Sequence, residues 1–369
     1  MTYFVFMAVA CACTYGAIAG WWRFAFIAFA IRPRRMTVAR LGLAVEDSDD
    51  VRRVDAILRC FVTAFNRAIA RPRASSWIDY CDTIPALHRP FAHEGGALGY
   101  TLRRLFRYDP IHFEQTIVRP RPEFRYLYYV GLGFWSGLRR HSAGRLAEIT
   151  DRLDPLHRFL CFDGYGFART FFESRENPAL PSELNRLEGY RRNAAYQGVG
   201  RALYFLYMGE PDLLVSRIRA LGDYAADAAA GVGLAAVFVN PDRLEAAQRL
   251  AAQIPSEWQA HFHLGMCFGL KARSINDLGQ FERDLSRLPK AVQDAAWASI
   301  RECDRIELLV RSESDPDGYK NWRARVTAWM SERIEYPLKS VREYRPAFAA
   351  ENGGGEGKPA FSRTRRIGR

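Results

Sequence analysis

The sequence predicts an all-α protein, and two observations carry that prediction. Strand-like alternation is weak along the 369 residues, whereas long segments repeat apolar residues at helical spacing. Several of these segments follow proline and a capping side chain, as the starts of helices do. Examples are PSELNRLEGYRRN, NPDRLEAAQRLAAQ and DPDGYKNWRARVTAWMSERI. With 49% hydrophobic residues the chain can bury a sizeable core.

Small residues recur along these predicted helices at a long period. One series is spaced by 67 residues (198 − 131 and 265 − 198), and a second follows it by 33 residues; together they are Gly131, Gly164, Gly198, Gly231, Gly265 and Ala298. Small residues allow helix backbones to approach closely. We therefore predict about four repeats of roughly 67 residues, each contributing a pair of Gly/Ala-rich inner helices, with shorter connecting helices.

Two carboxyl residues occupy the same place in this repeat. LHRPFAHEGGALGY and LHRFLCFDGYGFAR align so that Glu94 lies opposite Asp163, and each precedes a glycine within apolar, aromatic surroundings. Desolvation there would raise the pKa of a carboxyl group, which suits a general acid at neutral pH. We take Glu94, Asp163 and the adjacent His93 as candidate catalytic residues. The structural alternative is that each acid is paired with an arginine, and Arg201 is one candidate partner.

The residues expected to bind a substrate are mainly aromatic. We expect Arg201 to reach the carboxylates. An apolar cavity between the inner helices would be lined by aromatic side chains, namely Phe134, Trp135, Phe162, Tyr165 and Phe167. The H-x-H pair His261 and His263 is on a predicted helix, where alternate side chains diverge, so we predict no metal site. No P-loop or dinucleotide fingerprint is present, and we expect no cofactor.

The charge and cysteine content narrow the class of protein. The formal net charge is +12, yet 48 of the 53 basic residues are arginine and they are spread along the chain. Codon bias in a GC-rich genome produces such a composition, so we expect no nucleic-acid partner. The seven cysteines include no C-x-x-C pair. They indicate a reducing compartment rather than a disulfide framework.

The two ends of the chain differ from its middle. Residues 3–22 carry no charge and are long enough to span a bilayer, which takes roughly 20 residues. We predict that residues 1–22 are either an extension or a membrane segment, which would leave the body in the cytoplasm. Residues 23–345 would form the all-α repeat domain. The basic, Gly-rich residues 346–369 are predicted to be disordered.

Four short motifs in order resemble an all-helical bacterial family of unknown function that occurs in enediyne and related polyketide gene clusters. They are His93-Glu94-Gly95, Asp163-Gly164-x-Gly166-Phe167, Gly198-x-Gly200-Arg201-Ala202-Leu203 and Gly231-x-Gly233-Leu234-Ala235-Ala236. The resemblance covers roughly residues 23–310. The chain departs from the family at Gln197 (acidic there), at Tyr204 (tryptophan there) and at Ala-Ala before Gly231 (Trp-Ser there). The resemblance implies a role in secondary metabolism, in which the protein acts on or carries a large hydrophobic molecule. It does not supply a catalytic mechanism.

Two classes of function remain open from the sequence. The first is an accessory biosynthetic protein that encloses a polyene-like hydrophobic small molecule and, as an enzyme, catalyses proton-transfer cyclisation or isomerisation. The second is a non-catalytic helical-repeat scaffold that binds a partner such as a polyketide synthase. A third variant is a carrier tethered to a membrane through residues 3–22.

Overall fold

The computed structural model describes residues 30–43, 48–71, 73–103, 109–173 and 180–333. Within these ranges it is all-helical and has no strand, which confirms the predicted fold class. The proposed N-terminal segment, residues 1–22, and the basic tail, residues 346–369, lie outside the described residues. One described segment, Gly222–Val239, is long and apolar enough to cross a membrane, and 72% of it is buried inside the protein.

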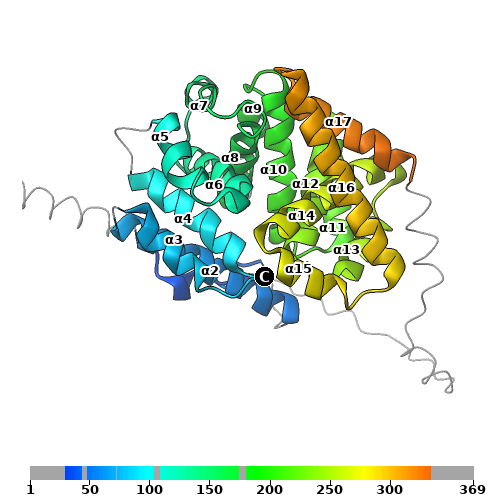
Figure 1. The fold of residues 1–369 in the computed structure, drawn as a ribbon, viewed down its shortest axis with the longest axis horizontal. Coiled ribbons are helices and arrows are strands. Elements are labelled where there is room, and N and C mark those ends of the chain that lie inside the picture. The colour runs from blue at the N-terminus through cyan, green and yellow to red at the C-terminus, as the bar shows by residue number, and fades with distance from the viewer. Residues whose placement is uncertain (1–29, 44–47, 72, 104–108, 174–179, 334–369) are drawn as a thin grey trace, which may run out of the picture.

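The long helices form a succession in which each packs on the one before it (Figure 1). They are α2 (Asp49–Ala70), α4 (Arg89–Arg103), α6 (Arg125–Leu138), α8 (Phe159–Glu173), α10 (Tyr190–Leu206), α12 (Ala225–Val239), α14 (Ser256–Asn276) and α16 (Lys290–Glu313). The last described helix, α17 (Gly318–Ser331), packs on both α14 and α16.

Short helices connect the long ones and lie toward the outside. They are η1 (Pro33–Arg35), α3 (Ala74–Asp82), α5 (Pro110–Phe113), η2 (Glu114–Val118), η3 (Pro122–Phe124), α7 (Ala143–Thr150), α9 (Leu180–Leu184), α11 (Pro211–Arg219), η4 (Gly222–Tyr224), α13 (Leu244–Ala251) and α15 (Leu278–Leu285). Several begin with a side-chain cap: Ser142 accepts a hydrogen bond from the Arg145 amide at the start of α7.

Glycines set the distance between neighbouring long helices. A Cβ atom at Gly164 of α8 would overlap the carbonyl oxygen of Val130 on α6. Two residues later, a Cβ atom at Gly166 would overlap the carbonyl oxygen of Ala195 on α10. The two glycines of FDGYGFA therefore allow α6 and α10 to approach α8 closely. The close packing offsets the free-energy cost of glycine within a helix.

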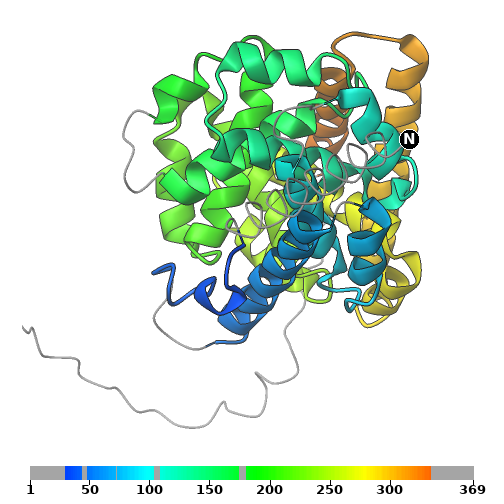
Figure 2. The same ribbon diagram turned by 90° about the vertical axis from the view of Figure 1, so that its left-hand side faces the viewer.

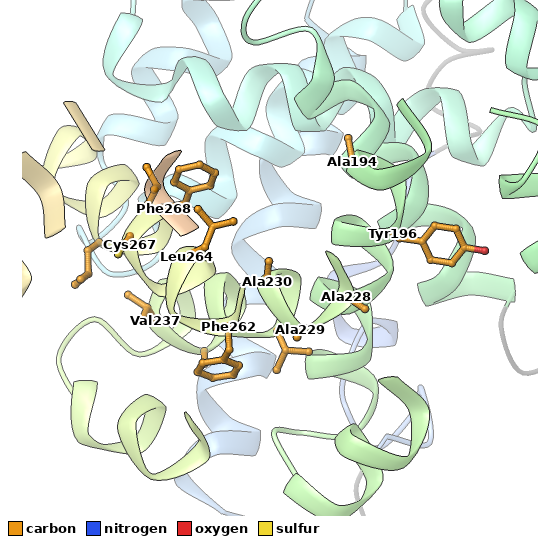
Figure 3. Close-up of a cluster of buried hydrophobic side chains, with 14 of the residues drawn as sticks. Ala194, Tyr196, Ala228, Ala229, Ala230, Val237, Phe262, Leu264, Cys267 and Phe268 are labelled. Atoms are coloured by element: carbon orange, nitrogen blue, oxygen red, sulfur yellow. The ribbon is translucent and has the colours of Figure 1, made fainter. Parts of the chain in front are cut away.

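The same arrangement recurs along the succession. The backbones of α10, α12 and α14 approach over small residues, since the Ala228 carbonyl oxygen meets Gly200 of α10 and the Ala230 carbonyl oxygen meets Gly265 of α14. Figure 3 shows Ala229 and Ala230 on the side of α12 toward Phe262 and Leu264. From α2 to α14, each long helix thus packs closely on its predecessor at one or more glycines. The division of these helices into four units of two stays a prediction, because the packing marks no boundary between pairs.

The succession curls so that its second half contacts its first (Figures 1 and 2). Arg53 of α2 bonds to Asp242 at 2.6 Å and 2.8 Å, and Arg273 of α14 donates to the Leu87 carbonyl oxygen before α4 at 3.0 Å. At the other end the Phe159 ring stacks on Tyr319 of α17, with centroids 5.3 Å apart. The helices therefore enclose an interior, which holds the candidate site.

Candidate functional site

Both candidate carboxylates face one arginine in this interior. Arg201 of α10 donates a hydrogen bond to Asp163 of α8 through Nη1, and its Nη2 lies 3.6 Å from Glu94 Oε1 on α4. All three residues are buried, with exposures of 6%, 1% and 3%. The structure thus brings both acids to one arginine, which is the partner that the structural alternative requires.

Asp163 has the fuller set of partners. Besides Arg201 it accepts a hydrogen bond of 2.7 Å at Oδ2 from Gln197 Nε2, one turn earlier on α10. The same amide nitrogen lies 3.4 Å from the Tyr319 hydroxyl. These two donors, one of them cationic, supply the hydrogen-bond partners that a buried carboxylate requires.

Glu94 is less well compensated. Its burial raises the pKa of the carboxyl to about 7, Arg201 opposes that rise, and the negative charge of Asp163 adds to it. A single guanidinium thus serves two carboxyl groups and lies much closer to Asp163. Near neutral pH Glu94 exists in both protonation states, as a general acid or base requires.

Glu94 lies in the wall of an apolar cavity, which we call the phenylalanine cavity. The volume of this cavity is about 90 Å³. For comparison, one water needs roughly 10–15 Å³, and a cavity of about 150 Å³ accepts benzene. Eight of the chain's 24 phenylalanines line it: Phe61, Phe65, Phe91, Phe134, Phe167, Phe171, Phe172 and Phe205. Among the described residues, the charged ones that line it are Glu94 and Arg201, and aliphatic side chains and Met36 complete it.

Asp163 lies in the wall of a second cavity of about 60 Å³, which we call the lysine cavity. Its polar lining includes Gln197, Lys271 and Tyr319, and the remainder is mostly apolar, from α6, α12 and α14 among others. Arg201 lines both cavities. The ion-paired group of Glu94, Arg201 and Asp163 therefore forms a polar partition between two apolar spaces.

His93 is buried away from this partition. Its ring stacks on Phe124 with centroids 3.6 Å apart, and its Nδ1 lies 2.9 Å from the Tyr128 hydroxyl. Its Nε2 lies 3.5 Å from Asp82. Burial lowers the pKa of His93 to about 3, so it stays neutral. The structure does not bring it into contact with the cavities, and we leave it out of the proposed site.

The predicted aromatic lining divides into two groups. Phe134 and Phe167 line the phenylalanine cavity, with ring centroids 5.4 Å apart. Trp135, Phe162 and Tyr165 line neither cavity. Tyr165 donates its hydroxyl to the His141 carbonyl oxygen at 3.1 Å, which gives it a structural role.

The sequence analysis did not identify Lys271, which lines the lysine cavity, or the acids that pair with it. Lys271 of α14 is 3% exposed, contacts Asp304 and lies 3.0 Å from Glu307 Oε2. Burial opposes ionisation of Glu307, but a hydrogen bond with His157 and the Lys271 charge together hold its pKa well below the usual range. One signal was in the sequence, since Lys271 is a lysine in a chain that uses arginine almost everywhere.

Among the residues that the structure describes, no group of three or more His, Cys, Asp or Glu side chains is placed to hold a metal ion. Comparison with known proteins gives one family: the model described as "Protein of unknown function (DUF1702)" matches residues 22–330. No curated protein and no solved structure matches the chain.

Proposed function

We propose a function for this chain from the geometry of its site. The chain belongs to the DUF1702 family, which is a family of unknown function. The chain binds an apolar, unsaturated molecule in the phenylalanine cavity, and Glu94 exchanges a proton with it. The observation that carries this proposal is the position of Glu94. A carboxyl group with a pKa of about 7 lines a cavity whose other walls are almost wholly apolar.

The cavity favours a slim, electron-rich ligand. Its volume of about 90 Å³ suits one segment of a linear chain rather than a fused ring system. Phenylalanine faces stabilise developing positive charge and stack on conjugated bonds. Protonation of a double bond by Glu94 would generate such a charge, and the glutamate could take a proton back from an adjacent carbon. The net result is isomerisation or cyclisation with no external oxidant or reductant.

Arg201 and Asp163 would adjust the acid's strength. Burial is the main cause that raises the pKa of Glu94, and around that value Arg201 favours the ionised form of Glu94 while Asp163 favours the protonated form. We also propose a role in polyketide or enediyne biosynthesis, and this part of the proposal depends only on the family resemblance. The geometry supports only the ligand class and the proton chemistry.

The test begins with the ligand. Native mass spectrometry of the purified chain, followed by solvent extraction, should recover an apolar unsaturated molecule. Incubation of that molecule in D₂O should place deuterium on carbon with the wild-type chain and not with Glu94→Gln. A chain that carries a bound polypeptide and no apolar molecule would instead favour the scaffold function and contradict the proposal.

A further inference from the structure

The phenylalanine cavity opens to solvent through an apolar rim. Among the described residues, eight large hydrophobic side chains are exposed, and three of these line this cavity. They are Ile31, Leu138 and Phe172, with exposures of 38%, 43% and 42%. Scattered apolar side chains need no explanation, but three at the mouth of one apolar cavity form a continuous route between its interior and the surface.

The rim is built by three separate parts of the chain. Ile31 precedes η1 and is anchored by Asn66 of α2, which accepts from the Ile31 amide at 2.9 Å and donates to its carbonyl oxygen at 2.7 Å. Leu138 ends α6 and Phe172 lies in the last turn of α8. The Phe172 ring meets Phe134, with centroids 5.8 Å apart. The exposure therefore belongs to an ordered surface.

Arginines adjoin the rim in sequence. Three exposed arginines, Arg32, Arg34 and Arg35, follow Ile31 in the sequence. Two more, Arg139 and Arg140, follow Leu138. Residues 30–43 contain no carboxylate. On the other side, Glu173 lies 3.2 Å from Arg140 and 2.9 Å from the buried Arg169, which also contacts Glu183. The surface around the cavity mouth is thus apolar at its centre and cationic at its edge.

We propose that this rim docks on an anionic lipid bilayer, so that an apolar ligand passes between the membrane and the phenylalanine cavity without crossing water. Apolar side chains flanked by cations are what interfacial binding requires. Each arginine near an anionic surface strengthens partitioning by roughly fivefold. Ile31, which belongs to this rim, is also the last residue of the apolar run that precedes Arg32 in the sequence. The ligand route depends on the proposed function, whereas the docking itself does not.

Vesicle flotation with the full chain tests the docking. Phosphatidylcholine vesicles with about one third phosphatidylglycerol should bind the wild type more tightly than pure phosphatidylcholine vesicles do. The variant L138S/F172S should lose about tenfold in partitioning to the anionic vesicles. The matched control L278S/L308S removes two exposed leucines that line neither cavity, and it should bind like the wild type.

A second variant tests the docking without changing the apolar side chains of the rim. R139S/R140S should lose affinity for the anionic vesicles and little for the neutral ones, with the helical circular dichroism spectrum retained. Wild-type binding by both variants would overturn the proposal, because membrane binding would then not depend on the rim. Vesicle binding at the rim without any recoverable apolar ligand would refute the proposed function and leave the docking intact.

Discussion

Arg201 Nη2 lies 3.6 Å from Glu94 Oε1, while the same guanidinium is hydrogen-bonded to Asp163. This asymmetry leaves one of two buried acids only partly neutralised. A carboxyl group in that position keeps its proton to a higher pH than an exposed glutamate does.

The first prediction concerns stability against pH. Because the pKa of Glu94 rises from 4.5 in the unfolded chain to about 7 in the folded protein, the native state binds the proton more tightly. The free energy of unfolding should therefore fall as the pH rises from about 4.5 to about 7, by something on the order of 3 kcal/mol, and then level off.

Glu94→Gln should lack this contribution, so the difference between variant and wild type should grow in the variant's favour toward pH 7. Urea unfolding at a series of pH values measures it. A difference that stays constant with pH would show that Glu94 has an ordinary pKa.

The second prediction concerns the partition. Arg201→Gln removes the cation from between Glu94 and Asp163 and should cost about 3–5 kcal/mol, because two buried carboxyl groups are left without it. Adding Asp163→Asn should recover part of that loss, since the acid closest to the arginine is then neutral. Chemical denaturation at pH 7 gives both values. Equal losses in the single and double variants would mean that Arg201 stabilises the fold through packing alone.

The third prediction concerns helix packing. Gly164→Ala should destabilise the protein by about 1–3 kcal/mol, because its Cβ would overlap the carbonyl oxygen of Val130. The control is Gly144→Ala in α7, where no atom lies within 4 Å of the new Cβ. That exposed helical position should gain up to about 1 kcal/mol. Thermal unfolding compares them, and similar effects at the two positions would contradict the close approach of α6 and α8.

The fourth prediction concerns occupancy of the phenylalanine cavity. Leu58→Trp should fill part of it and weaken binding of parinaric acid, a fluorescent conjugated tetraene, by about tenfold or about 1.4 kcal/mol. Leu221→Trp is the control, because Leu221 is also half-buried but lines neither cavity. Fluorescence titration measures both affinities. Equal weakening by the two variants would place the probe elsewhere.

Part of this site could be predicted from the sequence. The aligned positions of Glu94 and Asp163 before glycines showed that both would sit at close helix contacts, and Arg201 stood out as a charge on a glycine-rich face. Those signals are local, because each depends on one helix and its nearest neighbour.

The rest depends on how the succession of helices curls. Nothing local indicates that Lys271 and Tyr319 line the same cavity as Asp163, since α14 and α17 must return toward α8 and α10 to form it. The pairs Phe61 and Phe65, or Phe167 and Phe171, read as ordinary helical core stripes. The separation of His93 from Glu94 does follow from helix geometry, because adjacent residues on a helix point about 100° apart.

The protonation state of Glu94 tests the central claim most directly. The infrared band of the protonated carboxyl group, taken as the wild-type spectrum minus that of Glu94→Gln, can be titrated in the full chain. The account predicts a midpoint near pH 7. A band that has already vanished by about pH 5 would contradict it, because Glu94 would then titrate as an exposed glutamate does.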